Sequence, residues 1–225
     1  MKKYLFVFLK SILFIVIAFL IVFKSVSIYV ERKIIKQYPN RSMPEMSLND
    51  TAIIHFIHGS IPMKNCIYSR KRLGGLLGGH VEIELSGRVY GFRLRQLPVH
   101  VFVNNDDFNS KYEVNPKEKW LKRTEYEKMT SIYLCINAAQ KDKLQAILDT
   151  YLDKVPYDYA FFGKRCAAST VEVLSQAGII APLSDFENEL AFLSPRPLRN
   201  TLLTLADKKG LLVVKKVGVD CRYWE

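Results

Sequence analysis

Apolar residues fill one unbroken stretch near the start of the chain and then give way to short alternating and helical patterns. The stretch YLFVFLKSILFIVIAFLIVF, residues 4–23, is apolar except for Lys10 and Ser11. About twenty such residues span the hydrocarbon core of a bilayer as a helix, and Lys10 can snorkel toward the headgroups. The pattern therefore predicts one uncleaved transmembrane helix. A cleaved signal peptide is the alternative, although no small-x-small cleavage pattern follows the run.

The anchor sets the expected organisation of the whole chain. Residues 1–30 are expected to form the membrane anchor, residues 31–50 a linker that begins as a helical extension, and residues 51–225 a single domain. Basic residues precede the apolar run and also follow it, so the two flanks compete in setting orientation. Lys2, Lys3 and Lys10 favour a cytoplasmic N-terminus, which would place the domain outside the cytoplasm.

Alternation of apolar and polar residues after residue 50 predicts several strands. HVEIEL and RVYGF, residues 80–85 and 88–92, alternate and are separated by Ser-Gly, which is a short hairpin signal. Further strands are expected at 51–59, 97–103, 131–137 and 211–219. Residues 104–127 are interpreted as a loop with a short helix, and residues 181–195 as a loop.

Helical spacing follows the strand at 131–137. Asn137 can cap a helix with Gln140 as its capping-box partner, and Leu144, Leu148 and Tyr151 then share one face. A second helix is predicted to start near Cys166 and to end at Gly178 as its C-cap, and a third over residues 196–209, with Gly210 past its end. Because helices and hairpin-connected strands are mixed, the fold class is α+β, with an antiparallel sheet packed against helices.

Composition narrows the classes of function. The net charge is +11, but seven of the Lys and Arg residues lie in the first 36 positions, around the anchor. The rest of the chain is only modestly basic, so no nucleic-acid partner is expected. The four cysteines form no CxxC pair and no HExxH motif occurs, so we expect no metal and no cofactor. Cys135 is expected to be a buried apolar residue, and Cys66 and Cys221 can pair in an oxidising compartment.

Cys166 is the candidate nucleophile. It stands at the predicted start of a helix, where unpaired N–H groups and the helix dipole stabilise a thiolate. The neighbouring Lys164 and Arg165 are expected to lower its pKa further. Its own N–H is a natural donor for an oxyanion. The alternative is a buried cysteine that only packs the helix start.

His80 is the candidate base. It opens a strand after a glycine-rich run, GGLLGG at 74–79, and alternation places it on the polar face with Glu82 and Glu84. The glycines are expected to let the backbone turn tightly beside the helix that begins at Cys166. Exposure without function is the alternative. His55 and His58 should face opposite sides of one strand, in structural roles.

These motifs together resemble a known family. GGHVEIEL, then VYGF, then PYDYAFFGKRC leading into a helix, is similar to the circularly permuted branch of the NlpC-type papain-like superfamily, to which the lecithin:retinol acyltransferase-like proteins also belong. The resemblance covers residues 51–180 and implies a Cys166–His80 dyad. The residue before the cysteine in such families is often Asn or Asp, whereas this chain has Arg165.

Secondary site residues follow less directly. The strand RVYGFRLRQ offers no His, Asn or Asp to orient His80, so Glu82 is assigned that role, with Gln96 and His100 as further candidates. Tyr157, in the Pro-Tyr pair that resembles the family pattern, is assigned to substrate binding, and Tyr159 is a second candidate for the cleft. The basic run SRKRLGG, residues 69–75, is interpreted as a solvated loop or a headgroup contact.

The sequence thus predicts a membrane-anchored cysteine hydrolase that acts on amide or ester bonds. A cell-wall peptide is the substrate class ranked first, and an acyl lipid is the alternative. Two non-enzymatic hypotheses stay open: an inactive binding module on the same fold, and an assembly subunit that uses its anchor helix as the contact surface.

Overall fold

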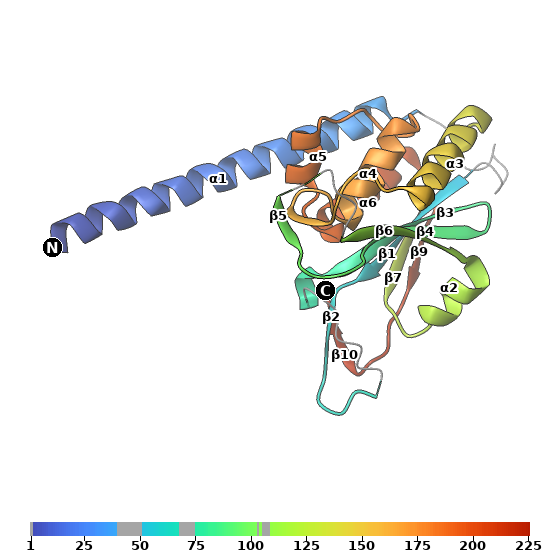
Figure 1. The fold of residues 1–225 in the computed structure, drawn as a ribbon, viewed down its shortest axis with the longest axis horizontal. Coiled ribbons are helices and arrows are strands. Elements are labelled where there is room, and N and C mark those ends of the chain that lie inside the picture. Colours follow the sequence, from blue (N-terminus) through green and yellow to red (C-terminus); the bar gives the residue numbers. More distant parts are fainter. Residues whose placement is uncertain (1, 40–50, 68–74, 103, 105–108) are drawn as a thin grey trace.

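The computed structural model describes residues 2–39, 51–67, 75–102, 104 and 109–225 (Figure 1). The helices are α1 Lys2–Gln37, α2 Lys117–Arg123, α3 Ala138–Asp153, α4 Cys166–Gln176, α5 Asp185–Ala191 and α6 Pro195–Lys209. The strands are β1 Thr51–His58, β2 Ser60–Pro62, β3 Gly79–Leu85, β4 Arg88–Leu94, β5 His100–Phe102, β6 Ser110–Pro116, β7 Met129–Cys135, β8 Ala160–Phe162, β9 Val213–Lys216 and β10 Arg222–Trp224.

A six-stranded sheet in the order β6-β4-β3-β1-β7-β9 forms the centre of the domain. Every neighbouring pair in it is antiparallel, which confirms the α+β class and the antiparallel sheet expected from the sequence. Two small ribbons lie beside it: β2 pairs antiparallel with β10, and β5 pairs parallel with β8. The Ser-Gly pair at 86–87 makes the expected hairpin turn, with positive φ at both residues.

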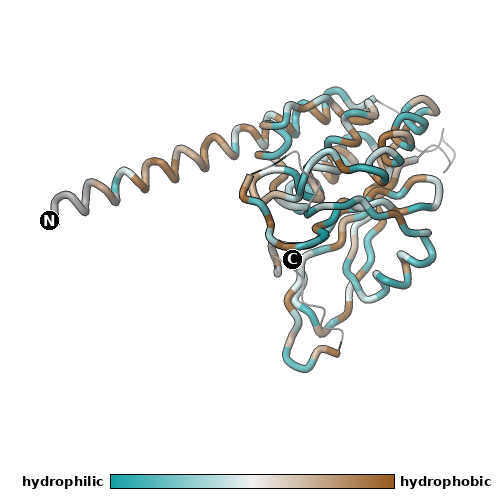
Figure 2. Tube along the Cα trace, in the orientation of Figure 1, coloured by the Kyte–Doolittle hydropathy of each residue, from teal (hydrophilic) through white to brown (hydrophobic). Residues whose placement is uncertain are grey.

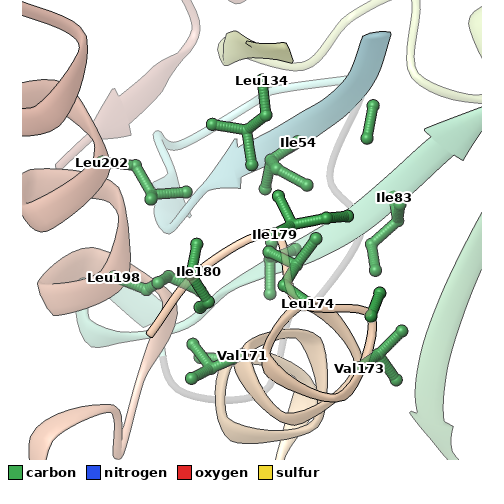
Figure 3. Close-up of a cluster of buried hydrophobic side chains, with 14 of the residues drawn as sticks. Ile54, Ile83, Leu134, Val171, Val173, Leu174, Ile179, Ile180, Leu198 and Leu202 are labelled. Atoms are coloured by element: carbon green, nitrogen blue, oxygen red, sulfur yellow. The ribbon is translucent and has the colours of Figure 1, made fainter. Parts of the chain in front are cut away.

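Helices α3, α4 and α6 cover one face of the sheet, and α2 covers the other (Figure 1). The α4 side holds the main core. In Figure 3, Ile54 of β1, Ile83 of β3 and Leu134 of β7 meet Leu174 of α4 and Leu202 of α6. These side chains come from alternate positions of each strand, as a sheet with one apolar face requires. A smaller apolar cluster lies on the α2 side.

Helix α1 is one continuous helix. Its first part is apolar and projects from the domain, and its last turns pack against the domain (Figure 2). Its apolar part is long and apolar enough to cross a membrane. Val30 and Ile34 of its last turns are buried in the main core together with Tyr38, which follows α1. The Tyr38 hydroxyl donates to the Cys135 carbonyl and accepts from the Cys135 N–H. The first part of the expected linker therefore continues the helix, as expected, and its residues through Tyr38 also pack into the domain.

Several elements escaped the sequence prediction. Helix α2 is the short helix expected within 104–127, but strand β6 was not expected there, and α5 lies in the predicted loop at 181–195. Ser184 and Glu187 form a capping box at the start of α5, a signal that the sequence carried. The predicted strand at 97–103 is shorter, because β5 begins only at His100.

A disulfide joins Cys66 to Cys221 and ties the segment after β2 to the start of β10. Cys135 is buried, as expected, and it and Cys166 are the two cysteines outside the disulfide. The pairing that the sequence left open is thus formed in the structure.

Candidate functional site

Cys166 is the first residue of α4, as the sequence predicted. The preceding Arg165 is the N-cap residue and has an extended backbone, but its side chain makes no capping hydrogen bond. The first N–H groups of a helix have no partner inside the helix. In α4 the N–H of Ala167 is directed at the Cys166 sulfur, and the N–H of Cys166 at the Tyr159 hydroxyl.

Three hydrogen-bond donors point at the Cys166 sulfur: the N–H groups of Val81 and Ala167 and the hydroxyl of Tyr159. Burial nevertheless dominates and raises the pKa of the Cys166 thiol, although these donors and the charge of Arg165 act in the opposite direction. The sequence predicted a lowered pKa from the helix terminus and its basic neighbours. That prediction was wrong because the side chain is almost fully buried, and burial disfavours the thiolate.

Lys164 does not serve the sulfur as the sequence suggested. Its ammonium lies 2.6 Å from a carboxylate oxygen of Glu172 and 2.6 Å from one of Asp185, so its charge is compensated by α4 and α5. Arg165 stacks its guanidinium over the ring of Phe161 and donates to the Leu193 carbonyl. Of the two basic neighbours, Arg165 is the one whose charge acts on Cys166.

The hydrogen bond from the Val81 N–H to the Cys166 sulfur lies where the pairing of β3 with β4 ends. In the β3–β4 hairpin, Leu85 and Arg88 close the turn, so Ile83 and Val81 also direct their N–H groups toward β4. Among the residues that the structure describes, this ladder runs only from Leu85↔Arg88 to Ile83↔Tyr90. The Val81 N–H lies beyond its end and donates to the Cys166 sulfur instead. We call this place the β3–β4 split.

His80 approaches the same split from the other face of the sheet. Val81 faces α4, so alternation directs the imidazole of His80 to the α2 side, on the polar face that the sequence predicted. Its Nε2 atom lies 3.8 Å from a carboxylate oxygen of Glu82. A Cβ added to Gly91 of β4 would lie 3.3 Å from the same nitrogen, so the ring leans over β4 where that strand has no side chain.

Cys166 thus lies against Val81 of β3, and His80 is the residue before Val81, but the two side chains lie on opposite faces of the sheet. The sulfur contacts the backbone of Val81 on the α4 side, and the imidazole lies on the α2 side next to Glu82. Any transfer of a proton between them has to cross the β3–β4 split. The sequence suggested the pairing but held no signal for the break in the ladder.

Glu82 is the centre of a buried charge cluster on the α2 side. Its carboxylate accepts from Trp120 Nε1 at 2.5 Å and from Arg123 at 2.9 Å, and it also pairs with Arg93. Burial acts to raise the pKa of Glu82, but the charges of His80, Arg93 and Arg123 outweigh it and hold the pKa at about 2. At 3.8 Å from His80, Glu82 acts on the imidazole through its charge and not through a direct hydrogen bond.

A cavity of about 300 Å³ lies beside Cys166. Its walls combine the glycine run, apolar side chains and the start of α6: Gly78, Gly79, Leu94, Val99, Tyr159, Phe161, Arg165, Cys166, Ser194 and Pro195. Gly79 has φ +99°, and a Cβ there would come within 2.6 Å of the Ile57 carbonyl oxygen. The expected close passage of the glycines beside Cys166 is therefore present at Gly78 and Gly79. Gly74 and nearly all of the basic run at 69–75 fall outside the described residues.

The two candidate tyrosines lie in different places, one at the cavity and one in the core. Tyr159 lines the cavity and its hydroxyl contacts the sulfur. Tyr157, which was assigned to substrate binding, is buried instead, and its hydroxyl lies 2.9 Å from that of Ser169 inside α4. Its ring packs edge-on against Phe92 in the core. Leu94, Val99 and the Ser194–Pro195 corner were not predicted, because only the tertiary fold brings them together.

The remaining histidines belong to other contacts. His55 hydrogen-bonds Glu84 and Ser131 on the α2 side, whereas His58 lies on the α4 side with its Nε2 2.9 Å from the Thr130 hydroxyl. They face opposite sides, as predicted. His100 pairs with Asp158 at the start of the β5–β8 ribbon. In the part of the chain that the structure describes, no three His, Cys, Asp or Glu residues are grouped to hold a metal.

Comparison of the chain with known protein families, curated proteins and solved structures found no match. The site is therefore interpreted from its own geometry: a buried thiol at a helix start, three donors around it, an apolar cavity on one side and a histidine across a split in the sheet.

Proposed function

We propose that the protein is a membrane-anchored cysteine hydrolase, with a permuted papain-like arrangement, that acts on amide or ester bonds through Cys166 and His80. The observation that supports it best is the placement of the Cys166 sulfur. It lies at the start of α4, on the wall of a cavity, with N–H donors of Val81 and Ala167 around it. Donors fixed around a reacting centre are the usual means of stabilising an oxyanion.

The chemistry proceeds in two steps. The sulfur attacks the carbonyl carbon, and its proton passes to His80, which returns it to the departing amine or alcohol. The N–H of Cys166, which donates to the Tyr159 hydroxyl in the resting structure, turns to the oxyanion at the start of α4 as the oxyanion forms. Water then cleaves the thioester, releases the acid and restores the thiol. Because burial raises the pKa of the resting thiol, the attack depends on a base.

The proposed base works across the β3–β4 split. His80 precedes Val81, whose N–H already reaches the sulfur, and Gly91 leaves the space over β4 open to the imidazole. The negative charge of Glu82 at 3.8 Å stabilises the imidazolium that proton transfer creates. Glu82 is thus a positioning residue in this proposal.

Two observations support the proposed location. Helix α1 is long and apolar enough to span a bilayer and continues directly into the domain core. The Cys66–Cys221 disulfide is of the kind that persists in oxidising compartments. Together they support a single-pass anchor with the domain outside the cytoplasm.

The substrate class has two candidates. A cell-wall peptide amide is the class that the sequence resemblance ranks first. An acyl lipid is favoured by the cavity, whose walls include Leu94, Val99, Phe161 and Pro195. Apolar walls with few polar groups suit an acyl chain better than a hydrophilic peptide.

The test is formation of an acyl-enzyme. The full chain in detergent micelles is incubated with p-nitrophenyl esters of butyrate and palmitate, and intact mass and peptide mapping locate the adduct. We expect one acyl group on Cys166, no adduct in Cys166→Ala, and an unchanged adduct in Cys135→Ser, the matched change at the other free cysteine. Absence of the adduct, or its placement on Cys135, would contradict the proposal and favour a binding module.

A further inference from the structure

Large apolar side chains are exposed along the β5–β8 ribbon. Phe102 is 71% exposed, Phe162 45% and Phe161 52%, and Val101 of β5 and Leu97, which precedes β5, are also exposed. We call these five residues the apolar ribbon. Phe161 is also a wall residue of the Cys166 cavity, so the ribbon adjoins the candidate site.

The three aromatic rings of the apolar ribbon form one contiguous cluster. Strands β5 and β8 pair in parallel, with His100 opposite Ala160 and Phe102 opposite Phe162. The rings of Phe102 and Phe162 stack with centroids 6.1 Å apart, and those of Phe161 and Phe162 meet edge-on at 4.9 Å. Contiguous apolar surfaces of this kind mark contact sites for membranes, proteins or ligands.

The ribbon lies on the side of the domain from which α1 leaves it. In Figure 1, β5 is at the edge of the domain nearest the projecting helix, and Figure 2 shows that this part of the helix is apolar. The apolar run ends at Phe23, and Val26 already packs against the domain core. With a rise of 1.5 Å per residue, the domain begins only about 5 Å beyond the apolar run.

The candidate site is oriented toward the same side. A surface groove between α1 and α6 is lined by Phe23, Ser27 and Ile28 of α1 and also by Ser194. Ser194 is at the same time a wall residue of the Cys166 cavity. The cavity therefore adjoins the turns of α1 that follow the apolar run.

We propose that the apolar ribbon docks on the lipid surface of the bilayer that α1 spans, so that the Cys166 cavity opens at the membrane interface. The inference rests on the membrane anchor proposed above. Lipid is the occupant because α1 enters the domain as an unbroken helix and holds the ribbon close to the headgroups. Aromatic side chains are the residues that proteins place at this depth.

The test measures lipid contact by tryptophan fluorescence. The full chain carrying Phe102→Trp is reconstituted in phosphatidylcholine vesicles, with and without brominated acyl chains. The matched control is Val217→Trp, at an 83% exposed residue. It belongs to the segment between β9 and β10, which lies away from β5 in Figure 1. The unmodified chain gives the background from Trp120 and Trp224. We expect brominated lipid to remove at least about half of the added emission of Phe102→Trp and to leave that of Val217→Trp unchanged.

Two outcomes would overturn the docking. One is equal quenching of the two variants, and the other is a blue-shifted Phe102→Trp emission that brominated lipid does not quench, which would indicate a protein partner. Alkaline carbonate extraction of the same vesicles separates this failure from failure of the anchor. If the chain stays in the vesicles but the emission of Phe102→Trp is not quenched, the result supports the anchor and contradicts the docking. Acylation of Cys166 in micelles is measured independently of both.

Discussion

At the scale of single residues, Cys166 is subject to two opposing influences. Burial raises the pKa of its thiol, while the donors from Val81, Tyr159 and Ala167 favour the thiolate. The helix position could be predicted from the sequence, but the extent of burial could not, because it depends on how β3 packs against the start of α4. Cys166 therefore holds the position typical of a reactive thiol, but its raised pKa favours the neutral thiol in the resting structure.

Glu82 carries a prediction about stability and pH. Burial acts to raise the pKa of Glu82, but the charges of His80, Arg93 and Arg123 outweigh it. They hold the pKa in the folded protein at about 2, below its ordinary value of 4.5. A lowered pKa means that the stabilisation is complete above pH 4.5 and is lost as the pH falls toward 2. We expect Glu82→Gln to lower the free energy of unfolding at pH 7 by about 3 kcal/mol.

Urea unfolding at pH 7 and at pH 3 tests this expectation. The difference between the unmodified chain and Glu82→Gln should shrink at pH 3, where Glu82 has lost part of its advantage. Glu118→Gln, an exposed change on α2, is the control and should alter neither value by more than about 0.5 kcal/mol. An equal loss at both pH values would contradict the role of the Glu82 charge.

At the scale of elements, local signals predicted most of what the structure contains. The Asn137–Gln140 capping box, the Ser86–Gly87 turn and Gly210 after α6 all mark real boundaries. Strand β6 was missed because its residues 110–116 are mostly polar, and it is held by pairing with β4 and not by a strong pattern of its own. Likewise β10 and β2 depend on each other and on the disulfide.

The disulfide gives an element-scale prediction. Cys66 and Cys221 are 155 residues apart in the chain, and the bond fixes β10 to the β2 segment. Closing so long a loop restricts the unfolded chain, so Cys221→Ser should lower the free energy of unfolding by about 2–5 kcal/mol. Thermal unfolding with and without dithiothreitol measures it. The reductant should destabilise the unmodified chain and have no further effect on Cys221→Ser; equal effects on both would contradict the prediction.

At the scale of the whole molecule, the helix that forms the proposed anchor continues into the domain and contributes to its core. The sequence predicted the apolar helix from its length, but periodicity could not show that Val30, Ile34 and Tyr38 complete the domain core, because the charged residues between them suggested a linker. The helices on which α1 packs, α5 and α6, lie near the other end of the chain, and only the assembled fold reveals the contact.

Truncation distinguishes the two parts of α1. A chain lacking residues 2–24 keeps all three buried side chains and should unfold cooperatively, with a melting temperature within about 5 °C of the full chain in the same detergent. A chain lacking residues 2–38 loses three buried apolar side chains, so we expect it to be less stable by on the order of 5 kcal/mol. Circular dichroism melting curves measure both, and equal stability of the two truncated chains would contradict the merged architecture.

The central claim is that His80 acts on Cys166 across the β3–β4 split, and the rate of Cys166 alkylation by iodoacetamide as a function of pH tests it most directly. Peptide mass spectrometry follows the label at Cys166 in the unmodified chain, in His80→Ala, and in His100→Ala as the matched control. We predict that only His80→Ala moves the inflection of the rate to higher pH and slows alkylation at pH 7 by about tenfold or more. An unchanged rate and pH profile in His80→Ala would contradict the pairing.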